Sequence, residues 1–97
     1  MRESEVEKYL VKVVKSLGGE CRKVRWIGRR GAPDRVVMLP FKGPSIYVGD
    51  TIWIELKAPG KKPTKTQLRE HARMRKLGQQ FYVLDSIGAI DKWAASL

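Results

Sequence analysis

Three polar residues occupy positions where apolar residues would form strands more easily. Asp34 follows Pro33 and opens the apolar run "RVVML". Glu55 and Lys57 interrupt "TIWIELKA" at 51–58, a run typical of a buried strand. Because side chains alternate along a strand, the i, i+2 spacing puts Glu55 and Lys57 on one face. If the two strands are neighbours, Asp34 and Glu55 can converge on one hard cation.

Two carboxylates beside an ammonium group suit metal-assisted hydrolysis of a phosphodiester. Mg²⁺ (or Mn²⁺) takes one or two carboxylates, and water and substrate phosphate complete its shell. The backbone carbonyl of Leu56 is available as a further ligand. Lys57 would position or deprotonate the attacking water and offset charge on the phosphate. The alternative is that Glu-x-Lys is a solvated strand face and that Pro-Asp is ordinary turn chemistry.

The balance of charge indicates the class of partner. Twenty Lys and Arg against ten Asp and Glu give a formal net charge of +10 over 97 residues. This excess favours nucleic acid, with a merely solubilising surface as the alternative. The basic residues predicted to contact phosphate flank the polar residues in sequence: Arg29, Arg30, Lys61, Lys62, Lys65, Arg69 and Arg73. The sequence contains no base-reading motif, so recognition of a DNA structure such as a branch or flap is favoured.

Length and composition predict a single domain over residues 1–97. A chain of this size buries only about 60–65% of the surface that its unfolded form exposes, which favours support from a second copy. Cys21 is the only cysteine and His71 the only histidine, which excludes an internal disulfide and disfavours structural zinc. The sequence contains no membrane span, signal peptide or small-molecule cofactor motif, so we expect a cytoplasmic protein.

Hydrophobic periodicity predicts the elements that position these residues. The order is helix, three strands, helix, strand, helix, with approximate ranges 4–17, 20–28, 34–39, 51–58, 64–77, 80–85 and 86–97. The strand–helix–strand crossover between 51 and 84 requires a parallel pair. The class is therefore α/β, or α+β if the first strands form an antiparallel meander. The "FKGPSIYVGD" segment at 41–50 is predicted to be a turn-rich connection. If it forms a protruding hairpin, the hairpin would contact DNA or a second subunit.

Local patterns predict details of both long helices. In the first helix, Ser4 is a plausible N-cap, and Glu7 is placed to complete a capping box. In the second, Thr64 or Thr66 caps the N-terminus. The predicted buried face of that helix carries Leu68, Ala72 and Leu77, and His71 is expected on its surface.

Two blocks of sequence resemble the PD-(D/E)XK nuclease superfamily: "GAPD" at 31–34 and "IELKAPG" at 54–60. Within it, the chain is most similar to the small VRR-NUC domains, which occur as stand-alone phage proteins and as the nuclease end of larger DNA-repair enzymes. The resemblance spans nearly the whole chain, from "ESEVE" to "TKTQLREHARMRKLGQQFYVLDS". It implies a small mixed β-sheet flanked by helices.

The resemblance also implies roles for individual residues. Asp34 and Glu55 would bind the metal, and Lys57 would be the catalytic lysine. Gln67 matches a glutamine that the family places near this lysine. The family also places a helix-1 glutamate near the metal, and we prefer Glu7 for this catalytic and metal-binding role. Glu3 is its substitute, and the capping box is the alternative role of Glu7.

The activity implied is that of a metal-dependent, structure-selective DNA endonuclease. Stand-alone members are similar to Holliday-junction resolvases, which implies branched DNA such as junctions or flaps, a homodimer, and the host-cell cytoplasm for a phage protein. A two-fold dimer would present two matching sites to a symmetric four-way substrate. The alternatives are a non-catalytic nucleic-acid-binding module on the same fold and a structural or protein-binding phage factor.

Overall fold

The computed structural model describes residues 1–40 and 49–97. Most of the predicted turn-rich connection, residues 41–48, lies outside the described residues, and so does its expected contact with DNA or a second subunit. The elements follow the predicted order: α1 (Glu3–Ser16), β1 (Glu20–Lys23), β2 (Arg35–Leu39), β3 (Asp50–Leu56), α2 (Lys65–Lys76), β4 (Gln80–Leu84) and α3 (Ile87–Ala95). No helix in the described part of the chain is long and apolar enough to cross a membrane.

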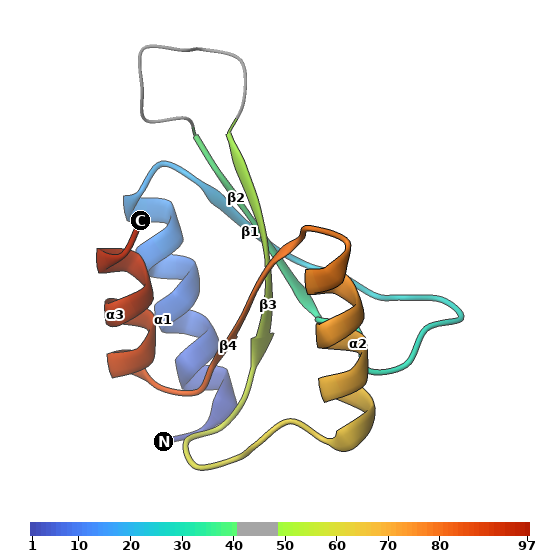
Figure 1. Cartoon of the computed structure of the whole chain (residues 1–97). Coiled ribbons are helices and arrows are strands. Elements are labelled where there is room, and N and C mark those ends of the chain that lie inside the picture. Colours follow the sequence, from blue (N-terminus) through green and yellow to red (C-terminus); the bar gives the residue numbers. More distant parts are fainter. Residues whose placement is uncertain (41–48) are drawn as a thin grey trace.

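The described strands form one mixed sheet in the order β1-β2-β3-β4. The first three strands pair antiparallel, and β3 pairs parallel with β4 through the α2 crossover. The parallel pair confirms the predicted crossover, and the antiparallel first strands form the meander that the sequence left open as the α+β alternative. In Figure 1, α1 and α3 lie together on one side of the sheet and α2 lies on the other.

The apolar core lies between the sheet and the α1–α3 pair. Alternate side chains of β3, from Ile52 to Leu56, are buried on this face. They join a cluster made up of Val6, Leu10, Val14, Val37, Leu39, Ile52, Ile54, Leu56, Leu84, Ile90 and Trp93. Because strand side chains alternate, Glu55 points to the opposite face, which α2 covers. One strand therefore supplies apolar residues to the core and polar residues to the other side.

The first strand is shorter than predicted. β1 ends at Lys23 instead of continuing to residue 28. The backbone N–H of Val24 donates to the carbonyl of Asp34 at 2.9 Å, and the chain then leaves the sheet as a loop over residues 25–33. Gly28 and Gly31 in this loop have φ values of 76° and 74°, which other residues rarely adopt. A strand prediction based on side-chain alternation does not detect these two backbone turns.

The capping prediction for α1 is wrong. The helix begins at Glu3 with Arg2 as its N-cap, so Ser4 lies inside the first turn. The carboxylate of Glu7 pairs instead with the buried guanidinium of Arg35 on β2. At α2, Thr64 is the N-cap and forms a complete capping box with Gln67.

The buried face of α2 also differs from the prediction. Leu68, Ala72 and Leu77 are exposed, whereas Glu70, His71 and Met74 are buried. Burial of the polar residues is possible because two arginines pair with Glu70. The ring of His71 also packs against Phe81, with 4.0 Å between the ring centroids. The expectation of a surface histidine is therefore wrong.

Candidate active site

The β2–β3 ladder brings the two predicted carboxylates together. Its register pairs Arg35 with Ile54, and continuing the ladder by one residue sets Asp34 opposite Glu55. Both side chains have an oxygen that is buried and lacks a hydrogen-bond partner among the described residues, Asp34 Oδ1 and Glu55 Oε1. Buried carboxylate oxygens are normally paired, so two neighbouring unpaired ones indicate a place for a ligand.

The pKa of Glu55 is raised because the carboxyl is buried close to a second carboxylate. The pKa of its carboxyl is raised to about 7, mainly by burial and then by the nearby charges of Asp34 and Glu3. The charge of Lys57 opposes the shift by lowering the pKa of Glu55. A positive charge placed between the two carboxylates would favour ionisation of both. A bound cation would therefore lower the pKa of Glu55 towards its ordinary value.

These residues fit a hard divalent cation. Within residues 1–40 and 49–97, no group of three or more His, Cys, Asp or Glu side chains could hold a metal ion. Two carboxylates without a third protein ligand suit Mg²⁺, which keeps several waters and binds substrate phosphate, better than a closed zinc site. The carbonyl of Leu56, between Glu55 and Lys57 at the end of β3, stays a predicted further ligand.

Arg35 orients Asp34 through an ion pair, a role that was not predicted from the sequence. Its guanidinium is 5% exposed and pairs with Asp34 Oδ2 at 2.9 Å. It also pairs with Glu7, and this ion pair ties α1 to β2. Arg35 therefore engages one oxygen of Asp34 and leaves Oδ1 unpaired. The available signal was a charged residue directly after Pro-Asp at the start of an apolar strand.

The two candidate glutamates of α1 have different surroundings. Glu7 is engaged by Arg35, whereas the charge of Glu3 acts on the pKa of Glu55. Because the charge of Glu3 raises the pKa of Glu55, Glu3 stays the alternative to Glu7 as the carboxylate beside the candidate metal site. The choice between Glu7 and Glu3 stays a prediction, and Arg35 is a partner of Glu7 that the sequence pattern did not indicate.

Gln67 is fixed at the first turn of α2 by the capping box. Its side-chain Oε1 accepts from the backbone N–H of Thr64 at 2.9 Å, and the Thr64 hydroxyl accepts from the Gln67 N–H at 3.2 Å. Gly31 packs against this turn so closely that a Cβ there would lie 2.7 Å from the Thr66 carbonyl oxygen. The "GAPD" segment and the first turn of α2 are thus held together, and a catalytic role of Gln67 stays a prediction.

His71 of α2 is buried beside Glu55. Its Nε2 lies 3.7 Å from Glu55 Oε1, and neither ring nitrogen has a hydrogen-bond partner within the described residues. The pKa of His71 is lowered to about 4, mainly by burial and then by the charges of Arg75 and Lys57. The imidazole is therefore neutral at physiological pH and adds no positive charge beside Glu55.

Comparisons with known proteins bear on the family of the chain. No family model matches the chain. "Putative nuclease p44" of Acyrthosiphon pisum secondary endosymbiont phage 1 is 51% identical over 86 residues, which cover 89% of this chain and 85% of that protein. A solved structure described as a VRR_NUC domain matches with a TM-score of 0.80 and 40% identity over 93% of this chain and 90% of its own. The chain belongs to the VRR_NUC family.

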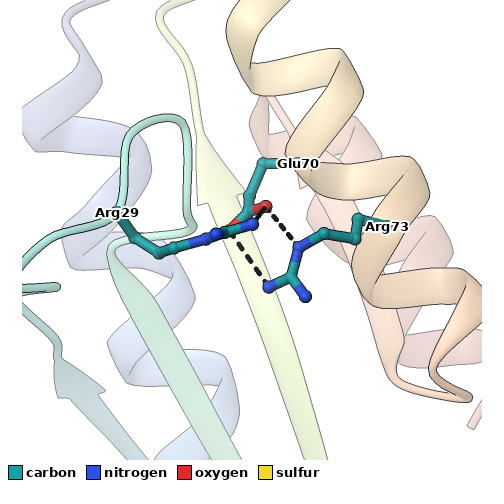
Figure 2. A network of polar contacts seen from close by, with 3 residues as sticks. All are labelled: Arg29, Glu70 and Arg73. Carbon is teal, nitrogen blue, oxygen red and sulfur yellow. Dashed lines mark hydrogen bonds and ion pairs between the residues drawn. The ribbon is translucent and has the colours of Figure 1, made fainter.

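In this VRR_NUC domain, two of the predicted phosphate-binding arginines converge on one acid. Arg29 from the 25–33 loop and Arg73 from α2 both bond to the buried carboxylate of Glu70 (Figure 2). The closest contacts are 2.8 Å from each arginine, and hydrogen bonds from Arg29 and Arg73 lower the pKa of Glu70 to about 2. The two arginine side chains remain 44% and 47% exposed, so a phosphate can still approach them.

The five remaining predicted phosphate-binding residues, here called the rim, are all exposed in the VRR_NUC domain. Arg30 is exposed in the 25–33 loop; Lys61 and Lys62 are exposed between β3 and α2. Lys65 and Arg69 are exposed in the first turns of α2. These residues come from the two segments that also supply Asp34 and Gln67, so the rim belongs to the chain segments that build the site. Contact with DNA stays a prediction for all of them.

Proposed function

We propose that this VRR_NUC domain is a metal-dependent endodeoxyribonuclease that cleaves branched DNA. The observation that carries the proposal is the pair of buried, unpaired oxygens of Asp34 and Glu55 beside the charge of Lys57. The nuclease name of the phage relative and the family of the solved structure support the same class of activity.

The residues divide the work of hydrolysis. Asp34 and Glu55 would hold Mg²⁺ or Mn²⁺, with Glu3 near them and Arg35 orienting Asp34. A bound cation would polarise the scissile phosphate and lower the pKa of the attacking water. Lys57 orients that water and offsets the charge that develops on the phosphate. His71, neutral and apolar at its Phe81 face, keeps bulk water away from the back of Glu55.

Selectivity for structure follows from the type of DNA contact proposed. The rim consists of lysines and arginines, which bind phosphates without reading bases. The net charge of +10 on 97 residues favours such contacts. A second copy would present a matching site to the other strand of a symmetric branch.

The test compares labelled four-way junction, flap and linear duplex DNA, each with Mg²⁺, Mn²⁺ or EDTA. We expect metal-dependent cuts near the branch, and no cuts with Asp34→Asn. Glu20→Gln, which alters an exposed carboxylate on β1, is the matched control and should cut like the wild type. Binding without cuts under either metal would contradict the enzyme and favour the non-catalytic module.

A further inference from the structure

The 25–33 loop is held as a rigid projection beside the candidate site. Its two ends are joined by the Val24–Asp34 backbone hydrogen bond of 2.9 Å. Just inside this closure, the indole N–H of Trp26 donates to the carbonyl of Pro33 at 2.7 Å. The Trp26 ring packs against Trp53 of β3 with 5.3 Å between centroids. The loop therefore leaves the sheet after Val24 and returns to it at Asp34, with these contacts fixing its base.

A second set of contacts fixes the loop against α2. Gly31 lies against the backbone of Thr66 and Gln67, where no Cβ would fit. Arg29 is bound through two hydrogen bonds to Glu70, which is itself buried (Figure 2). In Figure 1 the loop extends from the sheet past α2. Its tip cannot fold back onto the domain without breaking these contacts.

At the tip, the loop presents an apolar side chain to solvent. Ile27 is 96% exposed, the highest value among the exposed large hydrophobic residues of the ranges 1–40 and 49–97. Its neighbours Arg25 and Arg30 are exposed, and Arg29 is 44% exposed. Single exposed apolar residues are common on surfaces, but this one is held outward by anchors on both sides. The surrounding positive charge repels a second copy of this basic chain and attracts a polyanion.

We propose that Ile27 is a wedge that inserts between bases at an opened step of the bound DNA, with Arg25 and Arg30 on the flanking phosphates. Apolar side chains such as isoleucine act in this way in proteins that kink or unstack DNA. Unstacking is least costly where the duplex is already interrupted, so the wedge selects branches and flaps over continuous duplex. Because the loop ends at Asp34, insertion would set a fixed spacing between the branch and the cut. The inference rests on the proposed nuclease function.

The test uses Ile27→Ala, which removes an exposed side chain and leaves the fold intact. Binding is measured in EDTA, so that no cleavage occurs, with junction and linear duplex that carry 2-aminopurine at the branch or at the matching duplex position. We expect the wild type to raise 2-aminopurine fluorescence at the branch, and Ile27→Ala to abolish the rise. Branch selectivity should fall about tenfold with duplex affinity unchanged, since burial of one isoleucine supplies an effect of this order.

Two variants sharpen the comparison. Ile27→Leu keeps an apolar wedge and should retain selectivity and fluorescence. Leu77→Ala removes another exposed apolar residue, 63% exposed at the end of α2, and should behave like the wild type. Equal branch selectivity of Ile27→Ala and wild type would overturn the wedge. So would dissociation of a wild-type dimer by Ile27→Ala, which would assign Ile27 to a contact between copies. If the wild type neither bound nor cut branched DNA, the proposed function itself would fail.

Discussion

At the scale of single residues, the ionised carboxylate of Glu55 lowers the stability of the fold when no cation is bound beside it. Its carboxyl is buried and faces a second carboxylate, and its pKa is raised to about 7. An acid whose pKa is raised on folding stabilises the folded state only while it is protonated. The free energy of unfolding therefore falls as pH rises from about 4.5 towards 7, because Glu55 loses its proton. The destabilisation by the ionised carboxylate is complete above that range.

The first prediction follows from this sign. In EDTA at about pH 8, Glu55→Gln should raise the melting temperature by at least about 4 °C, because a difference of only ~1 kcal/mol has that effect in a domain of this size. Mg²⁺ should raise the melting temperature of the wild type and leave that of Glu55→Gln unchanged. Thermal unfolding at about pH 8 and about pH 5 measures both effects. A Glu55→Gln protein less stable than wild type at both pH values would contradict the assignment.

Lys57 and Lys61 allow chemistry and DNA binding to be separated. Lys57 lies beside Glu55, whereas Lys61 is exposed on the rim. Lys57→Ala should lower the single-turnover cleavage rate by orders of magnitude and change DNA affinity only a few-fold. Lys61→Ala should weaken DNA binding and lower the slope of log affinity against log salt concentration by about one. The cleavage rate at saturating protein should be retained. Equal losses of rate and affinity in Lys57→Ala would show that this lysine acts in binding alone.

At the scale of elements, the sequence predicted what depends on local pattern. The order of helices and strands and the parallel β3–β4 pair follow from apolar periodicity and turn residues, which act over a few positions. Asp34 and Glu55 could be paired because their strands are neighbours along the chain. The buried face of α2 could not be predicted. Glu70 is buried because Arg29, 41 residues away in sequence, reaches it from another segment. Arg35 was missed for the same reason, since its partner Glu7 lies 28 residues away.

The contact between α2 and the 25–33 loop has a testable pH dependence. The pKa of Glu70 is lowered to about 2 by hydrogen bonds from Arg29 and Arg73. An acid whose pKa is depressed on folding stabilises the fold when ionised, so its contribution is complete above about pH 4.5 and disappears as pH falls towards 2. Glu70→Gln should therefore be less stable than wild type near neutral pH, and the gap should narrow in acid.

Urea unfolding from about pH 7 down to about pH 3 measures this gap. Glu5→Gln, which alters an exposed acid in the first turn of α1, is the control and should follow the wild type at each pH. A gap that stays constant with pH would show that the ionised carboxylate of Glu70 is not what joins the loop to α2.

At the scale of the whole molecule, a small core and a large positive charge act together. One apolar cluster lies on the α1–α3 side of the sheet, where Arg35 also pairs with Glu7. The α2 side carries Glu55 and the network of Glu70 with Arg29 and Arg73. Like charges on one small domain repel, and binding of DNA would relieve that repulsion. A chain of 11.1 kDa with a single cluster also gains from association with a second copy. The charge favours binding of DNA and the small core favours a second copy, so we expect a dimer that is assembled, or strengthened, on DNA.

The dimer can be tested through the pattern of cuts. Wild-type protein is mixed with excess Asp34→Asn, equilibrated to exchange subunits, and given a four-way junction on a supercoiled circle, where paired cuts linearise the DNA and single cuts leave a nicked circle. A dimer with one active site per subunit should shift the products towards nicked circles, because mixed dimers cut one strand. The matched control replaces Asp34→Asn by the same excess of wild type and should give linear DNA. If the mixture only slows the reaction and the ratio of linear to nicked product is unchanged, each subunit acts alone and the dimer proposal fails.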